Sequence, residues 1–212
     1  MKTTTKQILA HLIERHPELT PNKAAIEEAY HTLHACLSSG NRLYLCGNGG
    51  SAADCEHMAG ELLKCFKKPR PLPTDEQTIL SSFGEMGEKL ATTLEDGLPV
   101  VSLCGHPAFS TAYQNDNAPE LVFAQQVHVY GQTGDVLVVF STSGNSKNCI
   151  YASIAAKARG MKIVLLTGGT GGKLKDWADV AIIVPEKETY LVQELHLPVY
   201  HCLCAMLEEE FF

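Results

Sequence analysis

Positively charged residues are scarce in this sequence: 17 Lys and Arg stand against 24 Asp and Glu, which gives a net charge of −7. Proteins that bind nucleic acids or anionic membranes present a stripe of Lys and Arg to phosphate groups, and no such stripe is present. The basic cluster at 64–70 is typical of a solvated helix end. We therefore expect no direct nucleic-acid binding.

The sequence also lacks a long apolar run. No segment approaches the length of a membrane-spanning helix, and Met1 to Thr5 lack the apolar core of a signal peptide. Eight cysteines fall within apolar segments and form no Cys-x-x-Cys pair, which favours buried, reduced thiols over disulfides or a thiolate zinc site. These features predict a cytoplasmic protein with no membrane partner.

Hydrophobic residues make up 45% of the chain, enough for a sizeable core. The length favours a single domain over residues 1–212, with two small domains as the alternative. Apolar residues at helical spacing predict a pair of helices within residues 1–40, divided by the turn Thr20-Pro21-Asn22. A helical pair ahead of an α/β core is often an oligomer interface.

Short apolar runs of strand type occur at 43–46, 99–103, 136–140, 163–166 and 180–184. Helical patterns near 119–131, 146–159 and 170–177 separate the later runs. This alternation predicts an α/β fold: a five-stranded parallel sheet with helices on both faces, forming a three-layer sandwich. Ligands of such sheets bind beyond the carboxyl ends of the strands.

The first run leads into the glycine-rich turn Asn48-Gly49-Gly50-Ser51 and then into a helical pattern. Exposed N–H groups at a helix N-terminus form a seat for an anion. The same helix carries His57 and Glu61, one turn apart on one face. An anion seat beside a His/Glu pair indicates an enzyme that acts on a phosphorylated small molecule.

A second candidate anion site, Ser-Thr-Ser-Gly-Asn-Ser, fills residues 141–146 between the third run and a helix. Its hydroxyls can donate several hydrogen bonds to a phosphate, aided by the helix dipole. Ordinary N-capping by Ser146 would need only one of them. The density of hydroxyls favours phosphate binding here and leaves the first turn to line the rest of the substrate.

The last helical pattern, at 188–210, places Gln193, His196 and His201 on one side of a mainly apolar helix. Such groups need partners, so they are either a site or satisfied core residues. Pro198 lies within the pattern and is expected to kink the helix.

Together these segments resemble the sugar isomerase (SIS) domain family, in particular its phosphoheptose isomerases, from about Arg42 to the C-terminus. The serine motif fits any SIS protein, whereas the His57/Glu61 and Gln193/His201 pairs are more specific. The resemblance implies a flavodoxin-like SIS fold and a homotetramer with active sites at subunit interfaces. The matching motifs are Cys-Gly-Asn-Gly-Gly-Ser-Ala-Ala-Asp (46–54), His-x-x-x-Glu (57–61), Asn-Asp (115–116), Gly-Asp-Val-Leu (134–137), the serine motif (141–146), Leu-Thr-Gly (166–168) and Gln-Glu-Leu-His (193–196) with His201.

The resemblance also implies a role for each matching residue. Glu61 and His201 would be catalytic. The phosphate would be held by Ser141, Thr142, Ser143 and Ser146. The sugar would be contacted by Asn48, Gly49, Gly50, Ser51, Glu61, Asn115, Asp116 and Gln193. One zinc ion per subunit would be bound by His57, Glu61, Gln193 and His201.

The implied reaction converts sedoheptulose 7-phosphate to D-glycero-D-manno-heptose 7-phosphate through an enediol(ate), as in heptose supply for surface polysaccharide. A proton moves between C1 and C2, which requires a base, an acid/base for the oxygens and stabilisation of negative charge. We expect Glu61 to be the base and His201 the acid/base. Zinc ligation would weaken Glu61 as a base. Gln193 and His201 also lie about 12 Å apart along an ideal helix, so shared ligation needs converging side chains, a kink at Pro198 or donors from different subunits.

The sequence departs from the family between Arg70 and Pro99, where an added segment at 72–98 has the apolar pattern of an amphipathic helix. This segment either packs on the surface or between subunits, or forms a lid that reshapes the sugar pocket. Two alternatives to the heptose enzyme are a DnaA-initiator-associating binding protein of the same fold and an isomerase of another sugar phosphate. Glu61 and His201, which such binding proteins lack, favour an enzyme.

Overall fold

Five parallel strands form the centre of the molecule, in the order β2-β1-β3-β4-β5. The computed structural model describes residues 1–212. This strand order is the flavodoxin-like one, and it confirms the predicted parallel sheet. The strands are β1 (Leu43–Gly47), β2 (Val100–Ser102), β3 (Val136–Phe140), β4 (Lys162–Gly168) and β5 (Val180–Val184).

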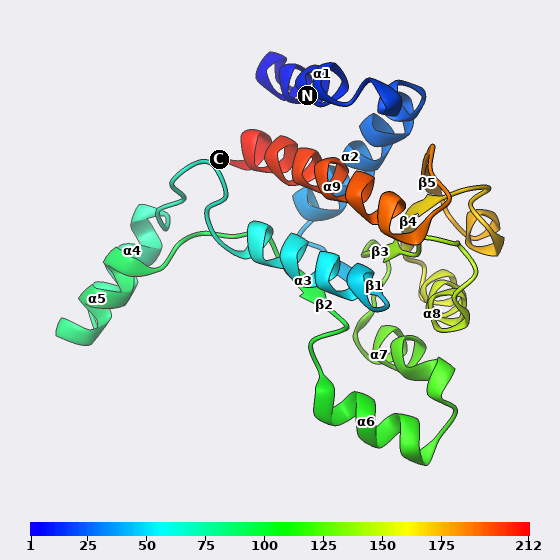
Figure 1. Cartoon of the computed structure of the whole chain (residues 1–212). Coiled ribbons are helices and arrows are strands. Elements are labelled where there is room, and N and C mark those ends of the chain that lie inside the picture. The colour runs from blue at the N-terminus through cyan, green and yellow to red at the C-terminus, as the bar shows by residue number, and fades with distance from the viewer.

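Helices cover both faces of the sheet, as the three-layer prediction requires (Figure 1). One face packs against α2 (Lys23–Ser38), α3 (Gly50–Leu63) and α9 (Thr189–Phe211). The other packs against α8 (Lys147–Ala158), and α7 (Val122–Tyr130) packs on α8 and shares its core. Successive strand residues point to opposite faces: Leu43 and Leu45 join the first core, whereas Tyr44 and Cys46 join the second.

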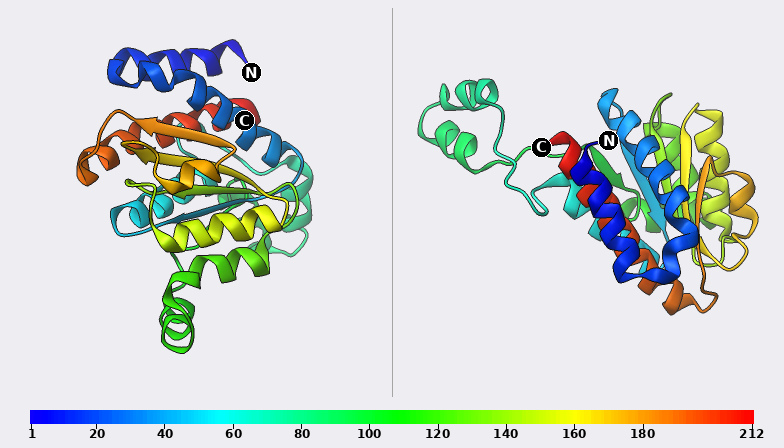
Figure 2. Two further views of the ribbon diagram at one scale, coloured as in Figure 1. Left: turned by 90° about the vertical axis from the view of Figure 1, so that its right-hand side faces the viewer. Right: turned by 90° about the horizontal axis from the view of Figure 1, so that it is seen from above.

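The N-terminal helix adds a further layer. The chain begins with α1 (Thr3–Arg15) and the 3₁₀ helix η1 (Pro17–Asn22), which leads directly into α2. Helix α1 packs against α9 rather than against the sheet (Figure 2). A groove between α1 and α9 results from this arrangement.

Three helical predictions need correction. Residues 170–177 form only the short 3₁₀ helix η3 (Lys173–Asp176), because Gly171 and Gly172 both adopt positive φ. The pattern at 119–131 divides into η2 (Pro119–Leu121) and α7, and α6 (Pro107–Asp116) was not expected. Segment 72–98 forms two helices rather than one, α4 (Thr74–Ser81) and α5 (Glu85–Thr93), because Gly84 at φ +78° interrupts the pattern.

All eight cysteines are free, and six of them are buried. No helix combines the length and the apolar character needed to cross a membrane.

Candidate active site

Helices α3 and α9 lie side by side and run in the same direction, which brings the His/Glu motif of one against the C-terminal motif of the other. Tyr200 contacts His57, 143 positions earlier in the chain. Gln193 contacts Gly50, which also lies 143 positions earlier in the chain, because a Cβ atom built on Gly50 would lie 2.6 Å from Gln193 Nε2. This register determines which predicted residues meet.

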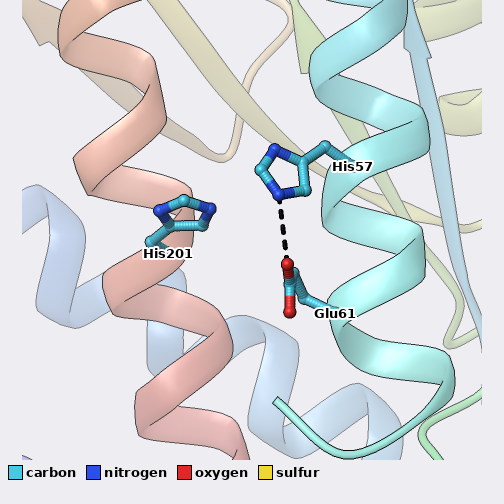
Figure 3. Close-up of side chains that lie close together, drawn as sticks. All are labelled: His57, Glu61 and His201. Carbon is cyan, nitrogen blue, oxygen red and sulfur yellow. Dashed lines mark hydrogen bonds and ion pairs between the residues drawn. The ribbon is translucent and has the colours of Figure 1, made fainter. Parts of the chain in front are cut away.

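His57, Glu61 and His201 form one cluster between the two helices (Figure 3). His57 Nε2 lies 3.0 Å from Glu61 Oε1, the contact that an i, i+4 spacing allows on a helix. The imidazole of His201 faces that of His57 nearly perpendicularly, with ring centroids 4.9 Å apart. One ligand atom from each residue lies within 4.8 Å of the others.

The cluster can hold a metal ion. Burial, reinforced by the neighbouring His57, lowers the pKa of His201, which favours the neutral imidazole that metals bind. Its Nε2 is buried and has no hydrogen-bond partner, so a ligand for this atom would relieve an otherwise costly burial. Two imidazoles and one carboxylate are a donor set found in catalytic metal sites.

A second group of polar residues holds the ring of His57. The Tyr200 hydroxyl lies 2.9 Å from His57 Nδ1 and 3.4 Å from Asp54 Oδ1. Burial, followed by the charge of Asp54, raises the pKa of Tyr200, so this hydroxyl keeps its proton. A partner on Nδ1 fixes the ring orientation and leaves Nε2 facing Glu61.

The first glycine-rich turn begins at the carboxyl end of β1. Gly49 has φ +57° and leads into α3, a conformation that favours glycine. The amides of Asn48 and Asn148 exchange two hydrogen bonds, of 3.0 and 2.7 Å. These bonds join the turn to the first turn of α8, and Ser51 is buried beneath it.

The serine loop follows β3, the neighbour of β1, so the two loops adjoin at the point where the strand order reverses. Ser146 precedes α8 but makes no side-chain capping bond; its hydroxyl lies 3.3 Å from that of Ser141. Ordinary N-capping therefore does not explain the serines. Gly144 packs directly on Gly171, because a Cβ atom there would lie 1.9 Å from the Gly171 oxygen.

Within one chain the predicted site falls into two halves. Glu61 is eleven residues beyond Gly50 on α3, about 16 Å along the helix axis. Gln193 lies at the Gly50 end, about two turns from His201. Thus the structure brings His57, Glu61 and His201 together, and it places Gln193 near the glycine-rich turn instead.

Asn115 and Asp116 lie outside both halves. They are exposed at the end of α6, where Asn115 Nδ2 donates to Asp116 Oδ1 at 2.9 Å, and α6 projects away from α3 and α9 (Figures 1 and 2). His196 belongs to the core rather than to a site: burial lowers its pKa to about 4, and its ring packs against Phe140.

Three further residues contribute to the site without having been assigned a role from the sequence: Asp54, Asn148 and Tyr200. Asp54 closes the Cys-Gly-Asn-Gly-Gly-Ser-Ala-Ala-Asp motif, and Tyr200 shares the polar side of the last helix. Their residue types and their positions beside the predicted site residues could have indicated a role in the site. Their partners depend on the α3–α9 register, which one helix alone does not reveal.

Comparisons with known proteins identify the family of this chain. The family described as SIS domain matches residues 7–100 and 97–168. A phosphoheptose isomerase of a Nitratiruptor species is 40% identical over 175 residues, which cover 82% of this chain and 80% of that protein. Another, from Helicobacter pylori, is 36% identical over 206 residues, covering 97% and 94% of the two chains.

A solved structure of a phosphoheptose isomerase from Neisseria gonorrhoeae has a TM-score of 0.72 at 30% identity and covers 98% of this chain and 100% of its own. One from Francisella tularensis has a TM-score of 0.71 at 28% identity, with 97% and 93% covered. The family match, the identity to these relatives and the shared fold thus show that the chain belongs to the SIS domain family, in its phosphoheptose isomerase branch.

Proposed function

We propose that this protein isomerises sedoheptulose 7-phosphate to D-glycero-D-manno-heptose 7-phosphate. The observation that carries the proposal is the His57–Glu61–His201 cluster, in a chain that is 40% identical to a phosphoheptose isomerase. The non-catalytic alternative is not favoured, because Glu61 and His201 are both present and adjacent. An enediol(ate) route needs one base near C1 and C2 and one group that moves protons at the oxygens.

Glu61 is the base in this proposal, and His201 is the acid/base at the sugar oxygens. The pKa of His201 is lowered by burial, which leaves a neutral imidazole able to accept and return a proton near neutral pH. His57 holds the Glu61 carboxylate through its 3.0 Å contact, and Tyr200 orients His57. The base is thereby fixed before substrate arrives.

The serine loop is the proposed phosphate site, with Ser141, Thr142, Ser143 and Ser146 as donors. Helix α8 has no side-chain cap, and although the Cys149 N–H donates to Asn148 Oδ1, the N–H groups of Lys147 and Asn148 are left available to an anion. The sugar carbons would then lie against residues of the first turn and of α6, namely Asn48, Gly49, Gly50, Ser51, Asn115 and Asp116, and against Gln193.

Zinc is the proposed metal, one ion per subunit, because two imidazoles and a carboxylate match its preferred ligands. His57, Glu61 and His201 would hold it. Gln193 of the same chain lies beside Gly50, so Gln193 would complete the ligand set from another copy. Zinc, when bound, supplies polarisation of the substrate carbonyl and stabilises the charge that develops on its oxygen.

A homotetramer with shared sites is the proposed assembly. The two halves of the site lie about 16 Å apart along α3. An extended heptose phosphate spans roughly 10 Å from C1 to phosphorus, at about 1.2 Å per bond. This mismatch supports a site in which the phosphate lies on the serine loop of one copy and C1 lies at Glu61 of another.

One substrate panel tests the reaction. Purified protein is incubated with sedoheptulose 7-phosphate and other ketose phosphates, with zinc or with a chelator. We expect turnover of the heptose phosphate, loss with chelator, and abolition in Glu61→Gln with the assembly intact. Glu28→Gln, on the exposed surface of α2, is the matched control. Lack of turnover with zinc, combined with binding to a replication initiator, would establish the binding-protein alternative, and turnover of another ketose would correct the substrate.

The shared site has its own test. Glu61→Gln and Ser143→Asp chains, each inactive, are co-expressed with different tags and the mixed oligomers are isolated. Some shared sites then combine an intact Glu61 with an intact serine loop, so part of the activity should return. If each chain forms its site alone, no mixed oligomer regains activity.

A further inference from the structure

The hairpin formed by α4 and α5 exposes large apolar side chains. The two helices touch through a small residue, because a Cβ atom at Gly87 would lie 2.0 Å from the Leu80 oxygen. Larger residues consequently point outward: Phe83 is 75% exposed and Met86 84% exposed. The exposed apolar side chains of the hairpin are Ile79, Phe83, Met86, Leu90 and Leu94.

A short neck holds this hairpin away from the rest of its own chain (Figures 1 and 2). Pro71 and Glu95 form an antiparallel bridge, and the Asp96 N–H donates to the Arg70 oxygen at 2.7 Å. The Cys65 N–H donates to the Glu95 carboxylate at 2.8 Å. A hairpin tethered in this way is presented to other molecules rather than folded back on its own core.

The groove between α1 and α9 has an apolar wall and a basic lining. It encloses about 530 Å³, and its apolar wall includes Leu12, Phe66, Leu197 and Pro198. Arg15 and Lys67 line it together with His11 and His16, and no acidic residue lines it. The groove also reaches His201, so whatever fills it borders the metal-binding cluster.

We propose that the α4–α5 hairpin of one copy docks in the α1–α9 groove of a second copy. The two helices of the hairpin carry Asp75, Glu76, Glu85 and Glu88 against the single cation Lys89. An acidic hairpin meets a groove lined by Arg15 and Lys67 favourably, whereas two such hairpins repel each other. Reciprocal docking in a two-fold pair would bury both apolar patches and both grooves.

This contact makes the hairpin a wall of the partner's active site. The occupied groove excludes water from the side of His201 that faces α1, without any change in the three ligand residues. The proposed interface does not depend on which sugar is isomerised. Its primary readout is the mass of the assembly, so a failed activity assay would not contradict it.

A charge exchange tests the contact. Glu88→Arg on the hairpin and Arg15→Glu in the groove should each shift the assembly toward smaller species, with at least a tenfold rise in the dissociation constant measured by sedimentation. In the proposed contact Glu88 of one copy faces Arg15 of the other, so the two changes together in one chain should restore wild-type assembly with the signs of this pair reversed. Val129→Asp, at an exposed apolar position on α7, is the control. Wild-type assembly in both single variants, or no restoration in the double variant, would overturn the proposal.

A photocross-link identifies the occupant directly. Benzoylphenylalanine is placed at Met86 in a mixture of ¹⁴N- and ¹⁵N-labelled chains, and cross-linked peptides are assigned by mass spectrometry. We expect mixed-isotope links from position 86 to residues 8–16 or 197–205. Links within one chain, links from hairpin to hairpin, or a chain that remains monomeric would each contradict the proposal.

Discussion

The ion pair of Arg70 and Glu208 allows a quantitative prediction. Both side chains are buried, and Arg70 Nε donates to Glu208 Oε1 at 2.9 Å. The other Arg70 nitrogens donate to the Leu62 oxygen at 2.9 Å and the Glu61 oxygen at 3.2 Å, at the end of α3. The pair thus joins the end of α3, which carries Glu61, to the end of α9.

Glu208→Gln removes one charge and leaves the guanidinium buried without its counterion. Breaking a buried pair in this way costs about 3–5 kcal/mol. The amide oxygen of the substituted side chain would still accept a hydrogen bond from the Phe66 or Lys67 N–H, both of which donate to Glu208, so the lower end applies, about 3 kcal/mol. At about 2–4 °C per kcal/mol for a chain of this size, Tm should fall by roughly 6–12 °C.

The assay is urea and thermal unfolding followed by circular dichroism, at one fixed protein concentration because the chain is expected to self-associate. The matched control is Glu209→Gln, which removes the adjacent carboxylate and its surface pair with Lys68 and should shift the midpoint far less. Replacing both members, as Arg70→Met with Glu208→Leu, should recover part of the loss. A Glu208→Gln midpoint no lower than that of the control would refute the reasoning.

Three further predictions follow from local geometry. Tyr200→Phe removes the hydroxyl that holds His57 and should weaken zinc binding about tenfold in a metal titration. Gly144→Ala places a Cβ atom 1.9 Å from the Gly171 oxygen and should raise KM for the sugar phosphate and lower Tm. Although burial opposes it, hydrogen bonds from two backbone N–H groups and Arg70 lower the pKa of Glu208. The stabilising contribution of the Glu208 carboxylate is therefore fully present above the pKa of a glutamate in the unfolded chain, and it is lost as the pH falls through the lower pKa of the folded state. Measuring the free energy of unfolding at pH 7, 5 and 3 checks this prediction.

The central sheet was predictable because its strands are buried on both faces and read as unbroken apolar runs. Residues 136–140 and 180–184 form strands with the predicted bounds. The helices around residues 107 and 173 were less predictable, since α6 has no buried residue and η3 follows two glycines at positive φ. A periodic apolar pattern is the signal for a helix, and neither segment packs enough apolar surface to produce one.

The hairpin shows a different limit. Its apolar spacing predicted one amphipathic helix, but the two helices pack through Gly87 and Ala91, and the large apolar residues face outward. Apolar periodicity identifies a face that must be covered and does not say what covers it. A single chain leaves that face exposed.

The separation of the site into two halves was, by contrast, implicit in the sequence. Once Gly50 to Leu63 is one helix, Glu61 must lie about 16 Å from its N-terminus, because an α-helix rises about 1.5 Å per residue. What the sequence could not supply is the register of α9 on α3, which sets Gln193 against Gly50 and His201 against His57. Since that register is parallel, no rotation of either helix brings Gln193 to the cluster. Pro198 does not interrupt α9, which runs from Thr189 to Phe211. Among the three routes to shared ligation, this packing favours donors from different subunits.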